Sequence, residues 1–429
     1  MSLQQIEQLI NQIKTSYQMP NKEFQNTFKH FENCVQSLKK ENQEQLNKVY
    51  KALKRFRRRL ENELKLNQTD YHAFIKKWKT MNITFVPLVY DVKLDFSKKI
   101  STLKYEDLIN VNFNHHHYTS KEMLKASMMI FHHLEVEQYA NYNNLENLLT
   151  QINLNYNIVS YHNFTHAFAL FQLLFCVYEK SDLKFFVTKQ DIFAALLASL
   201  SHDLNHKGVN NLYKVKKSKK INKNICEQAV LETMHVSTLF NIMAKNQQLN
   251  FFNQLPNIQQ QEFKRIIVSS ILATDMGQHF NIFSSFKDRV NATIDLCDNQ
   301  NITDPLIRYR GFNKDNFDDR KFILNVLVHA CDISNPCLEW DAYMKWSFLL
   351  AQEFQDQTIK EAAKGLEVTT MLQYKDKLTF FNGQTFFLNT FVLPQWQTIA
   401  TLYPSLIDLP NEVKRNLEIL EEEKKKLTN

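Results

Sequence analysis

Glycine is scarce in this sequence. The 429 residues include only five glycines, and the two closest, Gly365 and Gly383, are 18 positions apart. Neither G-x-G-x-x-G nor G-x-x-x-x-G-K can be written anywhere, which excludes the glycine-rich loops that cradle phosphate groups with backbone amides. Any nucleotide bound by this protein must therefore be held by side chains or by metal ions.

Closely spaced cysteine pairs and long apolar runs are missing as well. Six cysteines in a chain of this length, with no C-x-x-C, fit neither a disulfide scaffold nor a zinc ribbon. The first residues, MSLQQIEQLINQIK, have no apolar signal-peptide core, and no stretch of 18 apolar residues would span a membrane. We therefore expect a cytoplasmic protein without a transmembrane segment.

Positive charge is concentrated near the N-terminus. Residues 1–80 contain 16 Lys and Arg against 8 Asp and Glu, a net charge of +8, whereas the other 36 basic and 37 acidic residues nearly cancel. The densest piece, residues 51–59, is typical of the solvated face of a helix. The same composition also suits a nuclear signal or a contact with anionic lipid, so nuclear or membrane-surface association stays open. We expect no nucleic-acid partner.

Apolar residues recur at helical spacing along most of the chain. Residues 3–17 and 23–66 show this spacing in a polar background, and residues 191–200 and 227–244 show it in a more apolar one. Strand-like alternation is scarce, so we predict an all-α fold. The predicted organisation begins with a basic, amphipathic helical extension (1–91) that regulates the protein or binds a protein partner or a second copy. A compact multi-helix domain (92–410) and a charged helical tail (411–429) follow.

The seven histidines after residue 133 lie in a few short segments that also carry carboxylates. These segments are YHNFTH (161–166), SHDLNH (201–206), LETMH (231–235), ATDMGQH (273–279) and HACDISNP (329–336). Burying so many ionisable groups among helices is unfavourable unless they pair or bind metal. Imidazole nitrogens and carboxylate oxygens without thiolates suit zinc together with a harder ion such as magnesium or manganese.

In order and spacing, these segments resemble the class I 3′,5′-cyclic nucleotide phosphodiesterases of the His-Asp metal phosphohydrolase superfamily. Glu353-Phe354 with Gln357 is similar to that family's E-F-F-x-Q-G-D, and Gln384 with Phe387 is similar to its Q-x-G-F. The resemblance runs from about residue 92 to about residue 410. It implies an all-helical catalytic domain that hydrolyses a cyclic nucleotide to the 5′-monophosphate and so ends a cyclic nucleotide signal.

The resemblance also implies roles for individual residues. The metal ligands would be His166, His202, Asp203 and Asp332. Two divalent ions, zinc and magnesium or manganese, would share Asp203 and a bridging hydroxide, the nucleophile. The residues that orient ligands or hold metal-bound waters would be His206, Glu232 and Asp275. His162 would be the general acid, steadied by Glu353, and the substrate would be bound by Tyr161, Asn335, Gln384 and Phe387.

The side-chain amides favour cyclic AMP over cyclic GMP. Adenine presents an N6 donor beside the N7 acceptor, and a carboxamide can meet both. Asn335 follows the expected ligand Asp332, and S-N-P at this point resembles family members that prefer cyclic AMP. The shape of the pocket stays open because the sequence departs from the family pattern at Thr233, Met234 and Phe386.

Two other functions are compatible with part of this pattern. A His-Asp phosphohydrolase acting on another nucleotide would need the metal core but not the Gln384 and Phe387 clamp. A non-catalytic cyclic nucleotide-binding protein would be expected to lack a ligand or the acid. The complete set of ligand residues, the acid and the clamp favours hydrolysis of a cyclic nucleotide.

Two further clusters are predicted to lie on the surface. His115, His116 and His117 stand in a polar stretch before a helical run. Residues 214–223, which include six lysines, are interpreted as a solvated loop, close enough to the His-Asp segment to attract an anionic substrate by its field.

Overall fold

The computed structural model describes residues 103–220, 228–298 and 311–428, and these ranges contain helices and no strand. The predicted all-α fold is confirmed for this part of the chain. Its helices include none with the length and apolar character needed to cross a membrane. The predictions for residues 1–91, including the basic segment 51–59, lie outside the described residues.

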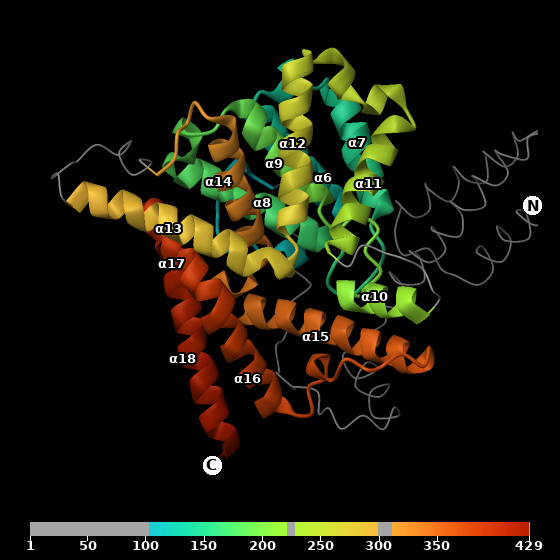
Figure 1. Cartoon of the computed structure of the whole chain (residues 1–429), viewed down its shortest axis with the longest axis vertical. Coiled ribbons are helices and arrows are strands. Elements are labelled where there is room, and N and C mark those ends of the chain that lie inside the picture. The colour runs from blue at the N-terminus through green and yellow to red at the C-terminus, as the bar shows by residue number, and fades with distance from the viewer. Residues whose placement is uncertain (1–102, 221–227, 299–310, 429) are drawn as a thin grey trace, which may run out of the picture. The chain divides into compact units, whose positions relative to one another are not determined.

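Helices of various lengths follow one another along the described chain (Figure 1). The α-helices are α5 (Tyr105–Leu108), α6 (Ser120–His133), α7 (Tyr142–Asn155), α8 (Phe164–Lys180), α9 (Lys189–Ser201), α10 (Asn211–Lys220), α11 (Val230–Ala244), α12 (Asn257–Ala273), α13 (His279–Asp298), α14 (Phe317–Asp332), α15 (Trp340–Ala363), α16 (Lys377–Phe387), α17 (Leu393–Leu402) and α18 (Asp408–Thr428). The short helices include η1 (His115–His117), η2 (Val136–Gln138), η3 (Asp182–Phe185), η4 (Gln247–Leu249), η5 (Phe251–Gln254), η6 (Met276–Gln278), η8 (Asn335–Cys337), η9 (Thr370–Leu372), the π-helical η10 (Leu388–Val392) and η11 (Pro404–Leu406).

Helix α9 lies at the centre of the core, packed against α8, α12 and α14 (Figure 1). Every residue of α9 after the first is buried, as expected of a helix that is apolar on all sides. Its first turn is closed by a capping box between Thr188 and Asp191. The Asp191 carboxylate also accepts a 2.7 Å hydrogen bond from Arg320 Nε of α14, so the start of α9 is tied to the neighbouring helix.

Helices α16, α17 and α18 pack together in the C-terminal part of the chain (Figure 1). The predicted boundary between residues 410 and 411 falls inside α18, where Val413, Asn416 and Leu420 are buried. Asn416 Nδ2 also donates to the carbonyls of Pro336 and Leu338, at 2.9 and 2.8 Å. The charged residues of this segment therefore occupy only one side of a helix whose other side belongs to the core.

Candidate active site

The first part of the site is the turn that leads into α8. Asn163 is the N-cap of α8, and its Oδ1 accepts from the backbone N–H groups of Thr165 and His166 at 2.9 and 3.3 Å. This cap satisfies amides that have no partner at a helix start, and it fixes His166 in the first turn. His162 precedes the cap, and its ring lies 5.7 Å from that of His166 at 84°.

The C-terminal ends of α9 and α14 contribute the other expected ligands. His202 directly follows α9, and its Nδ1 forms a 2.9 Å hydrogen bond with the carbonyl of Ser199. That bond fixes the ring, which leaves Nε2 to face Asp203 and Asp332. Asp332 is the last residue of α14, so packing of α14 against α8 and α9 brings the three segments together.

Four side chains converge in one cluster. His166 Nε2 lies 2.9 Å from Asp332 Oδ1 and 3.6 Å from Asp203 Oδ2. His202 Nε2 lies 3.2 Å from Asp332 Oδ1 and 3.1 Å from Asp203 Oδ2. Two imidazole nitrogens and two carboxylates drawn from three helix ends are a donor set that suits zinc, or zinc with a harder second ion. The fit to a divalent ion rests on this donor chemistry.

Electrostatics couple the four groups. Burial disfavours ionised carboxyls, yet the neighbouring imidazoles, His202 first, hold the pKa of Asp203 and of Asp332 below the usual range. Burial also disfavours a charged imidazole, but the two carboxylates raise the pKa of His202, whereas burial lowers the pKa of His166. The carboxylates thus keep their negative charge beside a protonated His202, and a bound divalent ion would replace that proton as their cationic partner.

A second cluster lies beside the first and is organised around Glu353 of α15. Glu353 Oε1 lies 2.5 Å from His162 Nδ1, and Oε2 accepts from the backbone N–H groups of Tyr161 and His162 at 2.9 and 3.1 Å. Burial opposes both charges, but the pair raises the pKa of His162 to about 9 and lowers the pKa of Glu353 to about 2. The geometry therefore holds a protonated imidazole in a fixed orientation.

Gly208 permits the close approach of Glu353 to this loop. Its φ of +62° is in the left-handed region, and a Cβ there would meet Glu353 Cγ at 3.2 Å and Val159 Cγ1 at 3.3 Å. A side chain at this position would strain the backbone and displace the carboxylate that orients His162. The glycine of the H-D-x-x-H-x-G segment thus has a steric role in the site.

The three residues predicted to support the metal site lie at different places. His206 Nδ1 accepts from Gly208 N–H at 3.1 Å and lies 3.6 Å from Glu353 Oε1, and burial lowers its pKa to about 3. Glu232 is buried and accepts from Asn211 Nδ2 at 3.3 and 3.0 Å, and burial raises its pKa to about 7. Asp275 caps η6 by accepting from Gly277 N–H. Within the described ranges, Asp275 forms no hydrogen bond or ion pair with the four clustered side chains.

Two residues outside the predicted set also contact Asp203. His235 Nε2 lies 3.6 Å from Asp203 Oδ1, and its Nδ1 is bonded to the carbonyl of Leu204 at 2.5 Å. The Tyr156 hydroxyl accepts from Asp203 N–H at 3.3 Å and donates to the carbonyl of Leu200 at 3.1 Å. His235 had a sequence signal, the last position of L-E-T-M-H, whereas nothing local distinguishes Tyr156.

Helix α15 connects the two groups of predicted substrate-binding residues. Asn335 Nδ2 donates to the Tyr161 hydroxyl at 2.5 Å, and Gln384 Oε1 accepts from the Tyr343 hydroxyl at 2.9 Å. Tyr343 and Trp346 stand one turn apart on α15, and the Trp346 ring meets the edge of Tyr161 at 5.6 Å. One helix therefore positions the amide of Gln384 and packs against the tyrosine that holds Asn335.

Two of the three residues that depart from the family pattern, Thr233 and Phe386, are exposed to solvent. Phe386 is 63% exposed and makes an edge contact with Phe391 at 6.1 Å, while the predicted stacking residue Phe387 is half-buried against the same ring. Thr233 is exposed and Met234 is partly buried on α11. Phe387 and Phe391 both pack against the core.

The sequence model of the 3′5′-cyclic nucleotide phosphodiesterase family matches residues 161–413, more than half of the chain. The chain belongs to this family. The matched segment contains all thirteen predicted site residues, from Tyr161 to Phe387.

Two curated phosphodiesterases from Dictyostelium discoideum are among its relatives. One, the 3′,5′-cyclic-nucleotide phosphodiesterase regA, is 30% identical over 60% of this chain and 30% of its own length. The other, the cGMP-specific 3′,5′-cGMP phosphodiesterase 3, is 25% identical over 73% of this chain and 63% of its own length. The chain therefore spans less than two thirds of the length of either relative.

Solved phosphodiesterase domains share the fold. The phosphodiesterase domain of the RhoPDE fusion protein from the choanoflagellate Salpingoeca rosetta matches with a TM-score of 0.66 and 24% identity, over 75% of this chain and 96% of that domain. At this identity the likeness establishes the all-helical architecture alone.

Of the three clustered histidines only His117 is exposed, whereas the prediction placed the whole cluster on the surface. His115 is 3% exposed, and its Nε2 is bonded to Gln172 Oε1 of α8 at 3.1 Å. Its ring meets that of Phe168, and the ring of His116 lies 4.3 Å from Trp346. The cluster was misjudged because the folding of η1 onto α8 and α15 depends on contacts between distant segments.

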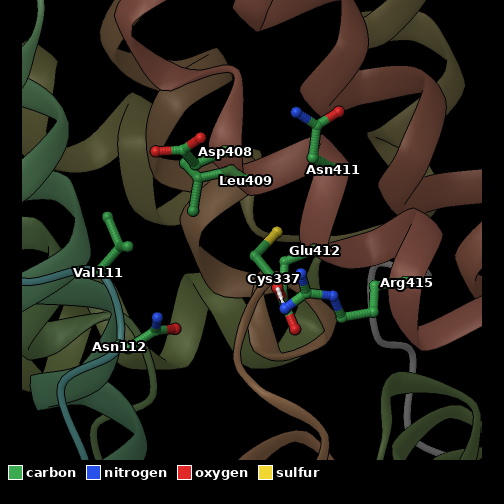
Figure 2. Close-up of a pocket in the computed structure, with 8 residues that line it drawn as sticks. All are labelled: Val111, Asn112, Cys337, Asp408, Leu409, Asn411, Glu412 and Arg415. Carbon is green, nitrogen blue, oxygen red and sulfur yellow. Dashed lines mark hydrogen bonds and ion pairs between the residues drawn. The ribbon is translucent and has the colours of Figure 1, made fainter.

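A separate hollow of about 370 Å3 lies between the segment before η1, η8 and the start of α18 (Figure 2). It is lined by Val111, Asn112, Cys337, Asp408, Leu409, Asn411, Glu412 and Arg415. Arg415 and Glu412 form an ion pair there at 3.3 Å. None of the predicted site residues lines this hollow, so it is distinct from the candidate active site.

Proposed function

We propose that this chain hydrolyses a 3′,5′-cyclic nucleotide to the 5′-monophosphate. The observation that carries the proposal is the proximity of a His2Asp2 cluster to a charged His162–Glu353 pair, in a chain of the cyclic nucleotide phosphodiesterase family. When bound, a pair of divalent ions supplies a nucleophile at neutral pH and offsets charge on the phosphoryl oxygens.

The proposed metal ligands are His166, His202, Asp203 and Asp332. Asp203 suits the role of a ligand shared by two metal ions. Its Oδ2 faces the imidazoles of His166 and His202, and its Oδ1 faces His235. His206, Glu232 and Asp275 are proposed to orient ligands or hold waters, and the contacts of His206 and Glu232 support that assignment best. Zinc with magnesium or manganese is the proposed pair of ions.

His162 is proposed as the general acid. Glu353 holds the Nδ1 side of the ring, which leaves Nε2 for the departing 3′ oxygen. A pKa raised to about 9 keeps the ring protonated at neutral pH, as a proton donor requires. His162 would then give its proton to the leaving oxygen as the 3′ ester bond breaks, and Glu353 would stabilise its orientation throughout.

Cyclic AMP is the proposed preferred substrate. Because Asn335 Nδ2 donates to Tyr161, the amide presents Oδ1 to a ligand, and an acceptor suits the N6 amine of adenine better than the O6 oxygen of guanine. Gln384 and Phe387 would read and stack the base from α16. Tyr343 fixes one side of the Gln384 amide and so limits its rotation.

The activity is tested by offering the purified chain cyclic AMP and cyclic GMP with magnesium and following release of the 5′-monophosphates. Asp203→Asn should abolish turnover and reduce bound metal, whereas His162→Ala should lower kcat by about 10²–10⁴ and leave the metal content unchanged. Turnover near wild type in Asp203→Asn would contradict the two-metal proposal. Absence of turnover in the wild-type chain, with cyclic nucleotide still bound, would favour a non-catalytic binding protein.

The preference is tested by the ratio of kcat/KM for the two substrates in one preparation. We expect the ratio to favour cyclic AMP and to fall in Asn335→Ala, which removes the Oδ1 acceptor proposed to meet the N6 amine of adenine. A wild-type ratio near one, or one that favours cyclic GMP, would reject the assignment and leave the hydrolytic proposal standing.

Residues 1–91 are proposed to bind a partner or a second copy, and the protein is proposed to act in the cytoplasm. The support is the +8 net charge of residues 1–80, and the free, buried thiols of Cys176, Cys331 and Cys337 agree with a reducing compartment. A chain starting at residue 92 should retain kcat and change its oligomeric state in sedimentation. Loss of folding in that chain would show that residues 1–91 belong to the catalytic domain.

A further inference from the structure

Helix α10 begins at the candidate active site, and the segment predicted as a loop is helical from Asn211 to Lys220. Asn211 Nδ2 donates to Glu232, and Asn211 Oδ1 accepts from Leu231 N–H at 2.8 Å. One residue earlier, Asn210 N–H donates to Gln357 Oε1 at 2.7 Å. The first turn of α10 is thereby fixed to residues around the metal cluster.

Two kinds of lysine lie on and beside α10. The first kind is structural: Lys216 Nζ donates to the Glu367 carbonyl at 2.8 Å and to Thr369 Oγ1 at 2.9 Å, and Lys364 Nζ donates to the Tyr213 hydroxyl at 2.7 Å. These bonds hold α10 against α15 and the segment that follows it. The hydrogen bonds of Lys216 and Lys364 therefore fix the orientation of α10 relative to the site.

The lysines of the second kind have no ion-pair partner among the described residues. They are Lys207 and Lys217, which are exposed, and Lys214, which is partly buried. Lys207 directly follows His206, and Lys214 and Lys217 share a face of α10 because they are three residues apart. Burial, together with the charges of Lys207 and Lys217, lowers the pKa of Lys214.

These charges lie close to the site on the scale of electrostatic screening. At 1.5 Å per residue, Lys214 is roughly 4.5 Å and Lys217 roughly 9 Å along the helix axis from Asn211. The screening length at physiological ionic strength is about 8 Å. Because Asn211 is bonded to Glu232 and Lys207 directly follows His206, the cluster borders the site, whose buried carboxylates would otherwise repel an anion.

We infer that Lys207, Lys214 and Lys217 form an electrostatic guide that speeds capture of the anionic cyclic nucleotide. The inference rests on the proposed function. The three lysines attract the anionic substrate as it approaches the site and while it is weakly bound. They make no contact with the reacting atoms. Its loss should reduce kcat/KM through KM, by about tenfold at low salt, and leave kcat unchanged.

The test compares three triple variants with wild type. Lys207→Gln, Lys214→Gln and Lys217→Gln together remove the guide, and Lys→Arg at the same positions keeps its charge. Lys424→Gln, Lys425→Gln and Lys426→Gln change the net charge equally at the end of α18, which lies well away from α10 in Figure 1. For each chain, kcat and kcat/KM are measured from low salt to roughly 0.5 M salt, where screening is nearly complete.

We expect wild type, the arginine variant and the α18 control to lose kcat/KM steeply as salt rises. The glutamine variant at positions 207, 214 and 217 should start lower, respond weakly to salt and meet the others at high salt. A glutamine variant with the salt slope of wild type, or with reduced kcat and unchanged KM, would overturn the guide while the measured turnover upheld the proposed function. A wild-type chain without turnover would overturn both.

Discussion

Glu353 is a single side chain with three partners in the site. It accepts hydrogen bonds from the backbone N–H groups of Tyr161 and His162 and pairs with the His162 ring. Since its own pKa is lowered to about 2, it carries a full negative charge at neutral pH. The orientation and the protonation of His162 both depend on that charge.

Glu353→Gln should therefore lower kcat by about 10²–10³, within the range expected for a positioned acid. The substitution removes the negative charge that raises the pKa of His162, so the loss of activity with rising pH should begin at a lower pH than in wild type. The measurement is a pH profile of kcat together with metal content. An unchanged profile, or metal lost in parallel with activity, would show that Glu353 does not act through His162.

His115 contributes to stability through its neutral form. Burial lowers its pKa from 6.5 to about 4, so below pH 6.5 the unfolded chain takes up a proton that the folded chain does not. The folded state is therefore favoured above pH 6.5, and this contribution is lost as pH falls towards 4. His115→Gln, which keeps a polar partner for Gln172, removes the effect.

We expect the free energy of unfolding to depend less on pH between 6.5 and about 4 in His115→Gln than in wild type. Urea unfolding at a series of pH values measures this, and His117→Gln, at an exposed position of the same η1 turn, is the matched control. Equal slopes in His115→Gln and wild type would contradict a neutral, buried His115.

At the scale of the element, α9 determines where His202 and Asp203 stand. The helix is held by the buried pair between Asp191 and Arg320 of α14, whose side chains are 1% and 11% exposed. Removing one partner of such a pair leaves the other charge buried and unpaired. The two helices that present ligands at their C-terminal ends are thus joined near their N-terminal ends.

Asp191→Ala should lower the free energy of unfolding by about 3–5 kcal/mol, as expected when a buried ion pair loses one partner. Arg265→Gln breaks the exposed pair between Arg265 and Asp318 and should cost less than about 1 kcal/mol. Both values come from urea denaturation of the full chain. A similar, small change in the two variants would mean that the Asp191–Arg320 pair does not hold the core.

At the scale of the whole molecule, α18 closes the C-terminal part of the fold. Its apolar side contacts α16 and α17, Asn416 binds two carbonyls around η8, and its first turns line the hollow in Figure 2. Because η8 includes Asn335, α18 also supports a residue proposed to bind substrate.

A chain ending at residue 410 should fail to fold or melt well below the full chain, because it loses the buried Val413, Asn416 and Leu420. A chain ending at residue 424 removes mainly exposed positions and should melt close to the full chain. Thermal melting monitored by circular dichroism separates the two. Equal melting of the shorter and the full chain would support a separate tail at 411–429, as the sequence alone predicts.

The all-α class, the family and the candidate residues of the site were accessible from the sequence. Helical periodicity and the spacing of His, Asp and Glu are local properties, so they are readable without coordinates. The same reasoning misjudged His115 and treated the lysines of α10 as a loop. In both cases the decisive contacts join segments far apart in the chain.

The sequence by itself determined which side chains are available for metal binding and acid catalysis, because their chemistry depends on residue type alone. Only the tertiary structure decided that Glu353 meets His162 across 191 positions and that Tyr343 fixes Gln384. It also decided that Lys207 and Lys214 lie beside the site without an ion-pair partner in the part of the chain that the structure describes. Such relations are set by how whole helices pack, and helix packing depends on the sum of many side-chain contacts that no local pattern encodes.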